Sequence, residues 1–325
     1  MSRYAANRII KDGMAVIELT DAGSDSVAEI VPEVGNNLYR FESGGRQVLV
    51  PPASVSSFKD VELADFQYGT PILFPPNRVK DGRMSYKGRE YHLPLNEPPH
   101  FHLHGEICSK AWEVVETGAS EERGAYAISR FRYAAHPAIM AYFPHPLTFT
   151  VTVSLREGRL EMNGTIANEG QDEAPLAFGL HPYFAIPFGN GEEIRLQVPA
   201  TAEWPVTNLA LVAGKPEVTA YSRSLSEGVS IADYPQLGCN LLTLAGGDST
   251  CRMEMKDRGY TIAYRFGPEF PYVLLFRPDW SSAYSLEPYT YVTDAFNLPY
   301  EHEWTGARGI AAGETFRFST SMWVE

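Results

Sequence analysis

Three observations predict an all-β protein built as a large antiparallel β-sandwich. Apolar and polar residues alternate with a period of two in many short segments, as in strands with one buried face. Glycine-containing turn signals such as SGG, KG, REG and DRG separate these segments. No stretch carries a 3.6-residue apolar repeat for more than about a dozen residues, the length of an average helix. Because repeats of propeller-blade length are absent from the sequence, a sandwich is favoured over a propeller.

The clearest strand lies at residues 147–155, LTFTVTVSL, and the next at 159–168, RLEMNGTIAN. The turn signal REG between them predicts a hairpin. Further strands are predicted at AVIEL (15–19), AWEVVE (111–116), YAISRFRY (126–133), EIRLQV (193–198), CRMEMK (251–256), YTIAYRF (260–266), YVLLF (272–276) and TFRFSTSMWV (315–324).

The chain has 325 residues, a length that permits two domains, but no linker or change in composition divides it. We therefore expect a single domain over residues 1–325, with loops from several strands meeting over one face of a sheet. The longest irregular region, residues 50–79, is rich in apolar residues. Loops of this length are more often functional than idle. Whether residues 50–80 close over a ligand is left open by the sequence.

The formal net charge of −13 is spread along the chain. Such a surface repels phosphodiester backbones and anionic lipids, so we expect neither nucleic acid nor a membrane as partner. The N-terminal residues lack the apolar core of a signal peptide, and no run of about 18 apolar residues occurs. Cys108, Cys239 and Cys251 lack CxxC spacing, so we expect reduced, structural thiols. These features predict a soluble cytoplasmic protein, either a monomer or a homodimer.

The first segment with candidate functional residues is PILFPPNRVKDG, which presents Asn77 and Arg78 directly after two prolines. The fixed backbone of the prolines gives Arg78 a stiff platform, and its planar fork of donors suits ligand oxygens. The alternative is a structural ion pair with a local carboxylate such as Asp81.

The second segment, PPHFHLHGE, places His100, His102 and His104 at alternate positions. On a strand these histidines would point to one side and could hold a transition metal with Glu106 as a fourth ligand. This spacing alone is weak support for a metal. We instead expect His104, beside Gly105, to reach into a pocket, with the other two histidines at the surface.

Two further segments place an ionisable group beside a proline. In FGLHPYF, His181 precedes Pro182, and the partner of its imidazole will decide its role: burial lowers its pKa and a neighbouring carboxylate raises it. In YSLEPYTYVTDAFN, Glu287 follows an apolar strand and precedes Pro288. A carboxylate there is costly to bury unless it is paired. A glutamate near an imidazole would form an acid/base pair, and the alternative roles are structural.

In this order, the motifs NRV, DG and YKG, then HLHG, GLHPYF and LEPYTYVTDAFN, resemble those of the aldose 1-epimerase (galactose mutarotase-like) family over about residues 13–322. The resemblance implies the large β-sandwich of that family and interconversion of the α and β anomers of a free aldohexose such as galactose or glucose. It implies His181 as general acid and Glu287 as general base, with Arg78, His104 and Asn77 binding the sugar. Because the protons are returned in each cycle, no metal and no organic cofactor is expected.

One position departs from the family pattern. The family usually carries an aspartate that binds sugar hydroxyls, and the equivalent segment YPQLGCNLLTL has Gly238, Cys239 and Asn240, with Asp233 a candidate substitute. The identity of the sugar is therefore open. Two alternatives are a hexose-phosphate epimerase, which would need additional Lys or Arg residues, and a non-catalytic carbohydrate-binding or sensing protein, which would need no acid/base pair.

Overall fold

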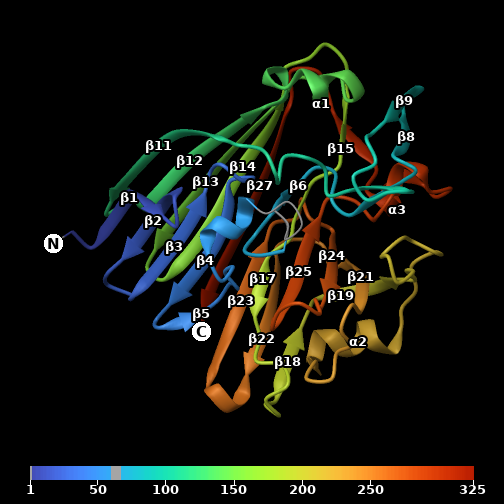
Figure 1. The fold of residues 1–325 in the computed structure, drawn as a ribbon. Coiled ribbons are helices and arrows are strands. Elements are labelled where there is room, and N and C mark those ends of the chain that lie inside the picture. Colours follow the sequence, from blue (N-terminus) through green and yellow to red (C-terminus); the bar gives the residue numbers. More distant parts are fainter. Residues whose placement is uncertain (1, 60–66) are drawn as a thin grey trace.

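A computed structural model describes residues 2–59 and 67–325 of the chain (Figure 1). Its strands form antiparallel sheets, and the predicted all-β sandwich is confirmed. We call one of them the N-terminal sheet; it contains β1 (Tyr4–Lys11), β2 (Met14–Asp21), β3 (Ser26–Val31), β4 (Asn37–Ser43) and β5 (Arg46–Gln47).

The second sheet, here called the long sheet, contains β11 (Glu113–Ser120), β12 (Gly124–Arg132), β13 (Leu147–Arg156), β14 (Arg159–Asn168), β27 (Thr315–Val324), β23 (Tyr260–Phe266), β22 (Ser249–Met255), β18 (Ile194–Gln197) and β20 (Val229–Ser230), in that order. The predicted hairpin is confirmed as β13 and β14. Its turn residues Glu157 and Gly158 both have positive φ, the conformation of a type I′ turn.

The third sheet, here called the site sheet, contains β19 (Ala200–Trp204), β21 (Cys239–Leu244), β24 (Tyr272–Phe276), β25 (Ala283–Tyr289), β16 (Gly179–Leu180) and β6 (Ile72–Leu73), with β17 (Tyr183–Ala185) also paired to β25. Shorter pairs join β7 (Arg78–Lys80) to β10 (Phe101–Leu103), β8 (Arg83–Tyr86) to β9 (Arg89–His92), and β15 (Ala174–Leu176) to β26 (Arg308–Ile310).

The N-terminal sheet and the site sheet lie side by side and pack on the long sheet (Figure 1). β1 and β2 contact β12. Phe178, directly before β16, and Phe184, in β17, contact β27 and β23 of the long sheet. The ring of Phe178 lies 4.5 Å from that of Phe318, and the ring of Phe184 lies 5.2 Å from that of Tyr264, between centroids. The apolar faces predicted from the period of two thus form the core between layers.

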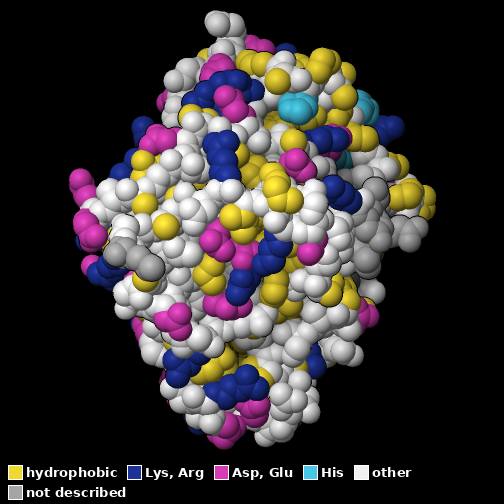
Figure 2. Space-filling view, turned by 60° about the vertical axis from the view of Figure 1, so that its left-hand side comes forward, with side chains coloured by type: hydrophobic (Ala, Val, Ile, Leu, Met, Phe, Trp, Pro, Cys, Tyr) yellow, Lys and Arg dark blue, Asp and Glu magenta, His cyan; other side chains and the backbone are white. Residues whose placement is uncertain are grey.

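The helices α1 (Pro137–Tyr142), α2 (Ala220–Glu227) and α3 (His302–Thr305) are short, and within the described residues none is both long and apolar enough to cross a membrane. Basic and acidic side chains are interspersed over the face in Figure 2, without a basic patch. The irregular region 50–79 contains a 3₁₀ turn at Val55–Lys59, β6 and the start of β7. Residues 60–66 lie outside the described residues, so the closure of this loop stays untested. Cys108 and Cys251 are buried, and Cys239 is partly buried.

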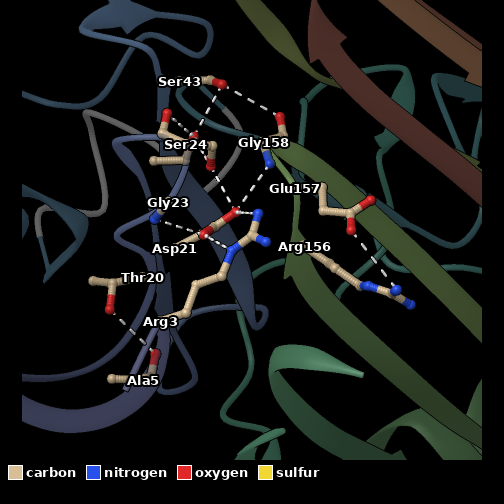
Figure 3. Close-up of polar contacts among 11 residues, drawn as sticks. Arg3, Ala5, Thr20, Asp21, Gly23, Ser24, Ser43, Arg156, Glu157 and Gly158 are labelled. Carbon is tan, nitrogen blue, oxygen red and sulfur yellow. Dashed lines mark hydrogen bonds and ion pairs between the residues drawn. The ribbon is translucent and has the colours of Figure 1, made fainter. Parts of the chain in front are cut away.

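Asp21 ties the N-terminal sheet to the β13–β14 turn (Figure 3). Its side chain is fully buried, and its Oδ1 accepts from Nε of Arg3 (2.9 Å) and N–H of Gly23 (3.0 Å). Its Oδ2 accepts from Oγ of Ser24 (2.6 Å) and N–H of Gly158 (3.2 Å). Burial alone would raise the pKa of Asp21, but these donors lower it to about 2. The ionised carboxylate is therefore a structural link between the two sheets.

We predict that Asp21→Asn lowers the free energy of unfolding by about 2 kcal/mol at pH 7. Because the folded pKa lies below the unfolded value of 3.8, this contribution is present above about pH 4 and is lost as the pH falls through 2. Urea unfolding at several pH values measures it. The exposed Asp25→Asn, in the same turn, should change stability by less than about 0.5 kcal/mol. Equal stabilities of the Asp21→Asn and wild-type proteins at pH 7 would contradict the link.

Candidate active site

A cavity of about 540 Å³ opens over one face of the site sheet. Its floor comes from strands β21, β24 and β25, and its walls come from the loops around residues 77–78, 96–104 and 208–210. The volume is in the usual range for small-molecule sites. Five of the candidate site residues named from the sequence line this cavity: Asn77, Arg78, His104, His181 and Glu287.

Strand alternation brings Glu287 to the cavity floor. Glu287 pairs with Leu274 of β24, and two residues earlier Ser285 pairs with Phe276, which in turn pairs with Cys239 of β21. Side chains two positions apart share one face of a sheet. The carboxyl group therefore projects from an otherwise largely apolar floor.

His181 reaches the same floor from the link between β16 and β17. Its N–H donates to the carbonyl of Pro71 (3.0 Å), and the N–H of Tyr183 donates to the carbonyl of Gly69 (2.8 Å). Between these two anchors, Pro182 fixes its own φ and restricts His181 to extended backbone. Pro182 and the two hydrogen bonds thus hold the backbone of His181 in place.

The imidazole of His181 is fixed on three sides. Its ring stacks on that of Tyr183, with centroids 4.5 Å apart and planes at 19°. Its Nδ1 lies 3.3 Å from Oγ of Ser285, and its Nε2 lies 3.1 Å from Oε1 of Glu287. The Oε2 atom of Glu287 accepts a short hydrogen bond from the hydroxyl of Tyr289. The structure thus joins an imidazole and a carboxyl that are 106 positions apart in the sequence.

Burial drives both groups toward their neutral forms. Glu287 is 1% exposed and His181 is 4% exposed. Burial raises the pKa of Glu287 well above its usual value, against the hydrogen bond from Tyr289 and the charge of Arg78. Burial likewise lowers the pKa of His181 to about 3. Apart from its contact with His181, the Oε1 atom of Glu287 has no hydrogen-bond partner among the described residues. It is therefore available to exchange a proton with a ligand.

His104 is a neutral hydrogen-bond donor at the wall of the cavity. Its Nδ1 accepts from the N–H of Asn77 (3.1 Å), so its proton is on Nε2. Burial lowers its pKa well below the usual value. The N–H of His104 donates back to the carbonyl of Asn77 (3.0 Å), and both residues have positive φ. A side chain at Gly105 would place Cβ 1.9 Å from the carbonyl oxygen of Phe74, so close packing of two loops fixes the ring.

Arg78 lies at the cavity wall but does not pair with Asp81, the partner considered from the sequence. Its Nε and Nη2 donate to Oε2 and Oε1 of Glu97 (2.5 and 2.6 Å), and its Nη1 donates to the carbonyl of Leu209 (3.0 Å). Asp81 instead lies 3.4 Å from the ring of His100. The Arg78 guanidinium is therefore held by the same loops that form the cavity walls.

Of the predictions for the other two histidines, the one for His100 is confirmed and the one for His102 is wrong. His100 is exposed, as expected, but His102 is buried, with its Nδ1 2.6 Å from the carbonyl oxygen of Pro94. Strand β10 ends at Leu103, and the positive φ of His104 breaks the alternation that would have aligned the three rings. Within residues 2–59 and 67–325, no group of His, Cys, Asp and Glu side chains is placed to hold a metal ion.

The suggested substitute for the family's aspartate is wrong. Asp233 is exposed and does not line the cavity. The side chain of Asn240 does not line the cavity either. It donates to Oε1 of Glu203 (2.6 Å) and accepts from the hydroxyl of Tyr234. Of this segment, Leu237 and the thiol-bearing Cys239 line the cavity. The floor at this position is therefore apolar.

Sequence reasoning missed three residues that shape the site. Tyr289 donates to Glu287, Glu97 holds Arg78, and Trp280 lines the cavity mouth at 39% exposure. The spacing of Tyr289, two residues after Glu287 on the same strand, was a usable signal. Nothing local marked Glu97 or Trp280, because their roles depend on contacts between distant loops.

We predict that Glu287→Gln stabilises the protein at neutral pH by several degrees in Tm. A carboxyl whose folded pKa lies above the unfolded value costs stability above the unfolded pKa, and a neutral amide avoids that cost. The gain should shrink as the pH falls below about 4.5. Differential scanning calorimetry measures the gain. Glu42→Gln, which removes a half-exposed ion pair elsewhere, should give no such gain; a destabilised Glu287→Gln protein would show that Glu287 is buried as a stabilising anion.

Comparisons with known proteins agree with this geometry. The model of the aldose 1-epimerase family matches residues 16–323. The protein YihR of Escherichia coli (strain K12) is 28% identical over 188 residues, which cover 57% of this chain and 56% of YihR, so the match spans about half of that relative. A galactose mutarotase-like protein from Clostridium acetobutylicum is 23% identical and superposes with a TM-score of 0.87 over 99% of this chain and 98% of that one. The galactose 1-epimerase of Lactobacillus acidophilus NCFM is 14% identical, with a TM-score of 0.78 over 99% of both chains. The two structures show the galactose mutarotase-like fold, and the family match over nearly the whole length shows that this chain belongs to the aldose 1-epimerase family.

Proposed function

We propose that this protein is an aldose 1-epimerase that interconverts the α and β anomers of a free aldohexose such as galactose or glucose. The observation that carries the proposal is the 3.1 Å contact between Glu287 and His181 on the floor of a cavity. Mutarotation needs one group that takes a proton and another that gives one at neighbouring oxygens of the sugar. A buried carboxyl and a buried imidazole supply both.

In the proposed reaction, the carboxylate of Glu287 takes the proton of the anomeric hydroxyl. The C1–O1 bond becomes a carbonyl, the C1–O5 bond breaks, and O5 receives a proton from Nε2 of His181. The open-chain aldehyde turns about the C1–C2 bond, and O5 attacks the other face of C1. His181 takes back the proton of O5, and Glu287 returns a proton to O1. Both groups end the cycle as they began it.

The resting pair already holds the protons that this cycle uses. A neutral carboxyl beside a neutral imidazole carries the same number of protons as a carboxylate beside an imidazolium. Moving one proton over the 3.1 Å between Oε1 of Glu287 and Nε2 of His181 converts one form into the other. Sugar hydroxyls and the nearby charge of Arg78 favour the charged form. Because adding or removing one proton disables the pair, activity should fall at both low and high pH.

The other residues of the cavity fit a sugar. The Nε2–H of His104 is a neutral donor with a fixed tautomer, and the guanidinium of Arg78 has N–H groups beyond those bound to Glu97 and Leu209. These donors would hold hydroxyls and stabilise negative charge on O5 as the ring opens. Asn77 positions His104 through its backbone. Phe276 and Trp280 provide an apolar wall for the C–H face of the ring.

Action as a cytoplasmic monomer or homodimer, and the single domain over residues 1–325, stay predictions. A non-catalytic sugar-binding role would need no acid/base pair, so activity measurements separate the two functions.

We predict that wild-type protein accelerates the polarimetric relaxation of freshly dissolved α-D-galactose or α-D-glucose. His181→Ala and Glu287→Gln should each lower kcat by about 10² to 10⁴-fold, because each removes one proton-transfer group, and KM should change little. The exposed His92→Ala and the distant Glu42→Gln are matched controls and should keep full activity. If the wild type binds these sugars without accelerating their relaxation, the binding-protein function is the correct one.

We further predict that Tyr289→Phe moves the basic limb of the kcat/KM profile, where the pair loses the proton of Glu287, to higher pH. The hydroxyl of Tyr289 lowers the pKa of Glu287, so its loss raises that pKa further and less carboxylate is present at a given pH. A hydrogen bond to a charged group contributes about 1.5–3 kcal/mol, so kcat at neutral pH should fall on the order of tenfold. Tyr142→Phe, which removes a bond to Glu106 outside the cavity, is the control. An unmoved basic limb would remove Tyr289 from the positioning of Glu287.

A further inference from the structure

The charge of Arg78 is balanced inside the cavity. Two parallel hydrogen bonds join its guanidinium to both oxygens of Glu97, the geometry of the strongest arginine–carboxylate pairs. The side chains are 18% and 33% exposed, so water screens this pair only partly. Among the described residues that line the cavity, Arg78 is the one Lys or Arg. The cavity therefore presents no net positive charge to a ligand.

Glu97 is held at this position independently of Arg78. Its backbone exchanges two hydrogen bonds of 3.0 Å with Phe101, which is in β10. The preceding Asn96 exchanges two more with the backbone of Leu103, at 2.6 and 2.8 Å. Because Leu103 pairs with Arg78 across β10 and β7, both members of the ion pair are fixed to one short antiparallel pair of strands. The ion pair of Arg78 and Glu97 is thus a fixed part of the cavity wall.

This pair matches hydroxyl groups better than anions. A hydroxyl donates one proton and accepts others, so it can give to a Glu97 oxygen and accept from an N–H of Arg78 that the existing bonds leave over. A carboxylate or phosphate could only accept. It would be repelled by the Glu97 carboxylate beside it and would have to break the bidentate pair to gain the full charge of Arg78.

We propose that Glu97 is a specificity-determining residue that restricts this site to neutral aldoses and discriminates against uronates and sugar phosphates. The inference rests on the proposed mutarotase function and names its substrate class. The position of the acid group on the sugar is not critical, because a charge acts over about 8–10 Å in salt solution, a distance comparable to the size of the cavity. Removing the charge of Glu97 should therefore admit anionic sugars.

The test compares D-galactose with D-galacturonate, which differ at C6, in wild-type and Glu97→Gln proteins. Anomer interconversion at equilibrium is measured by NMR exchange spectroscopy, and dissociation constants by calorimetry. The wild type should prefer galactose. Glu97→Gln should raise the galacturonate-to-galactose ratio of kcat/KM on the order of tenfold, and galacturonate turnover should become sensitive to salt.

Glu42→Gln is a closely matched control. Glu42 also forms a bidentate pair, with Arg40 at 2.9 and 3.0 Å, and is 31% exposed, but it lies outside the cavity. The galacturonate-to-galactose ratio of kcat/KM in Glu42→Gln should equal that of the wild type. In the double variant Glu97→Gln/Arg78→Met, the gain toward galacturonate should disappear, because it depends on the unmasked guanidinium.

The outcomes separate the two proposals. A ratio in Glu97→Gln that moves no more than in Glu42→Gln overturns the role of Glu97, even where the wild type is an active mutarotase. Wild-type protein that turns over neither sugar overturns the proposed function. The role of Glu97 is then decided by the ratio of the two dissociation constants: a shift toward galacturonate in Glu97→Gln supports it, and an unchanged ratio overturns it.

Discussion

The burial of one carboxyl against one imidazole is the constraint on which the site depends. Glu287 and His181 are almost completely excluded from water, and neither position would favour a charged group by itself. Their contact lets the pair hold a transferable proton without leaving an isolated charge in the core. The surrounding structure holds both groups in place: Glu287 is fixed by pairing with β24, and His181 by two backbone hydrogen bonds around Pro182.

The rest of the cavity is built by loops that the sheets bring together. Positive φ at Asn77 and His104 turns two chain segments toward each other, and the absence of a side chain at Gly105 lets them touch. This contact fixes the tautomer of His104 as a neutral donor. The floor of the cavity is apolar at Cys239, Leu274 and Phe276. The cavity thus combines a polar wall for hydroxyls with an apolar floor for the C–H face of a sugar ring.

The strands and the main site residues could be predicted from the sequence because both depend on local patterns. Alternation in residues 147–168 predicted β13 and β14, and prolines beside His181 and Glu287 marked constrained backbone. The errors arose where contacts between distant parts of the chain decide whether a side chain is buried. His102 was placed at the surface but is buried against Pro94, and Asp233 was offered as a sugar ligand but is exposed. Glu97 is 19 residues from Arg78, and no local pattern connects the two.

The most direct measurement is the crystal structure of the Glu287→Gln protein with a bound aldose, since this variant should bind the sugar without turning it over. The account predicts that the anomeric oxygen O1 lies within hydrogen-bond reach of residue 287 and that the ring oxygen O5 lies within reach of Nε2 of His181. A sugar seated with C1 at the cavity mouth, beside Trp280 and away from both groups, would contradict the assignment of His181 and Glu287 as the acid and the base.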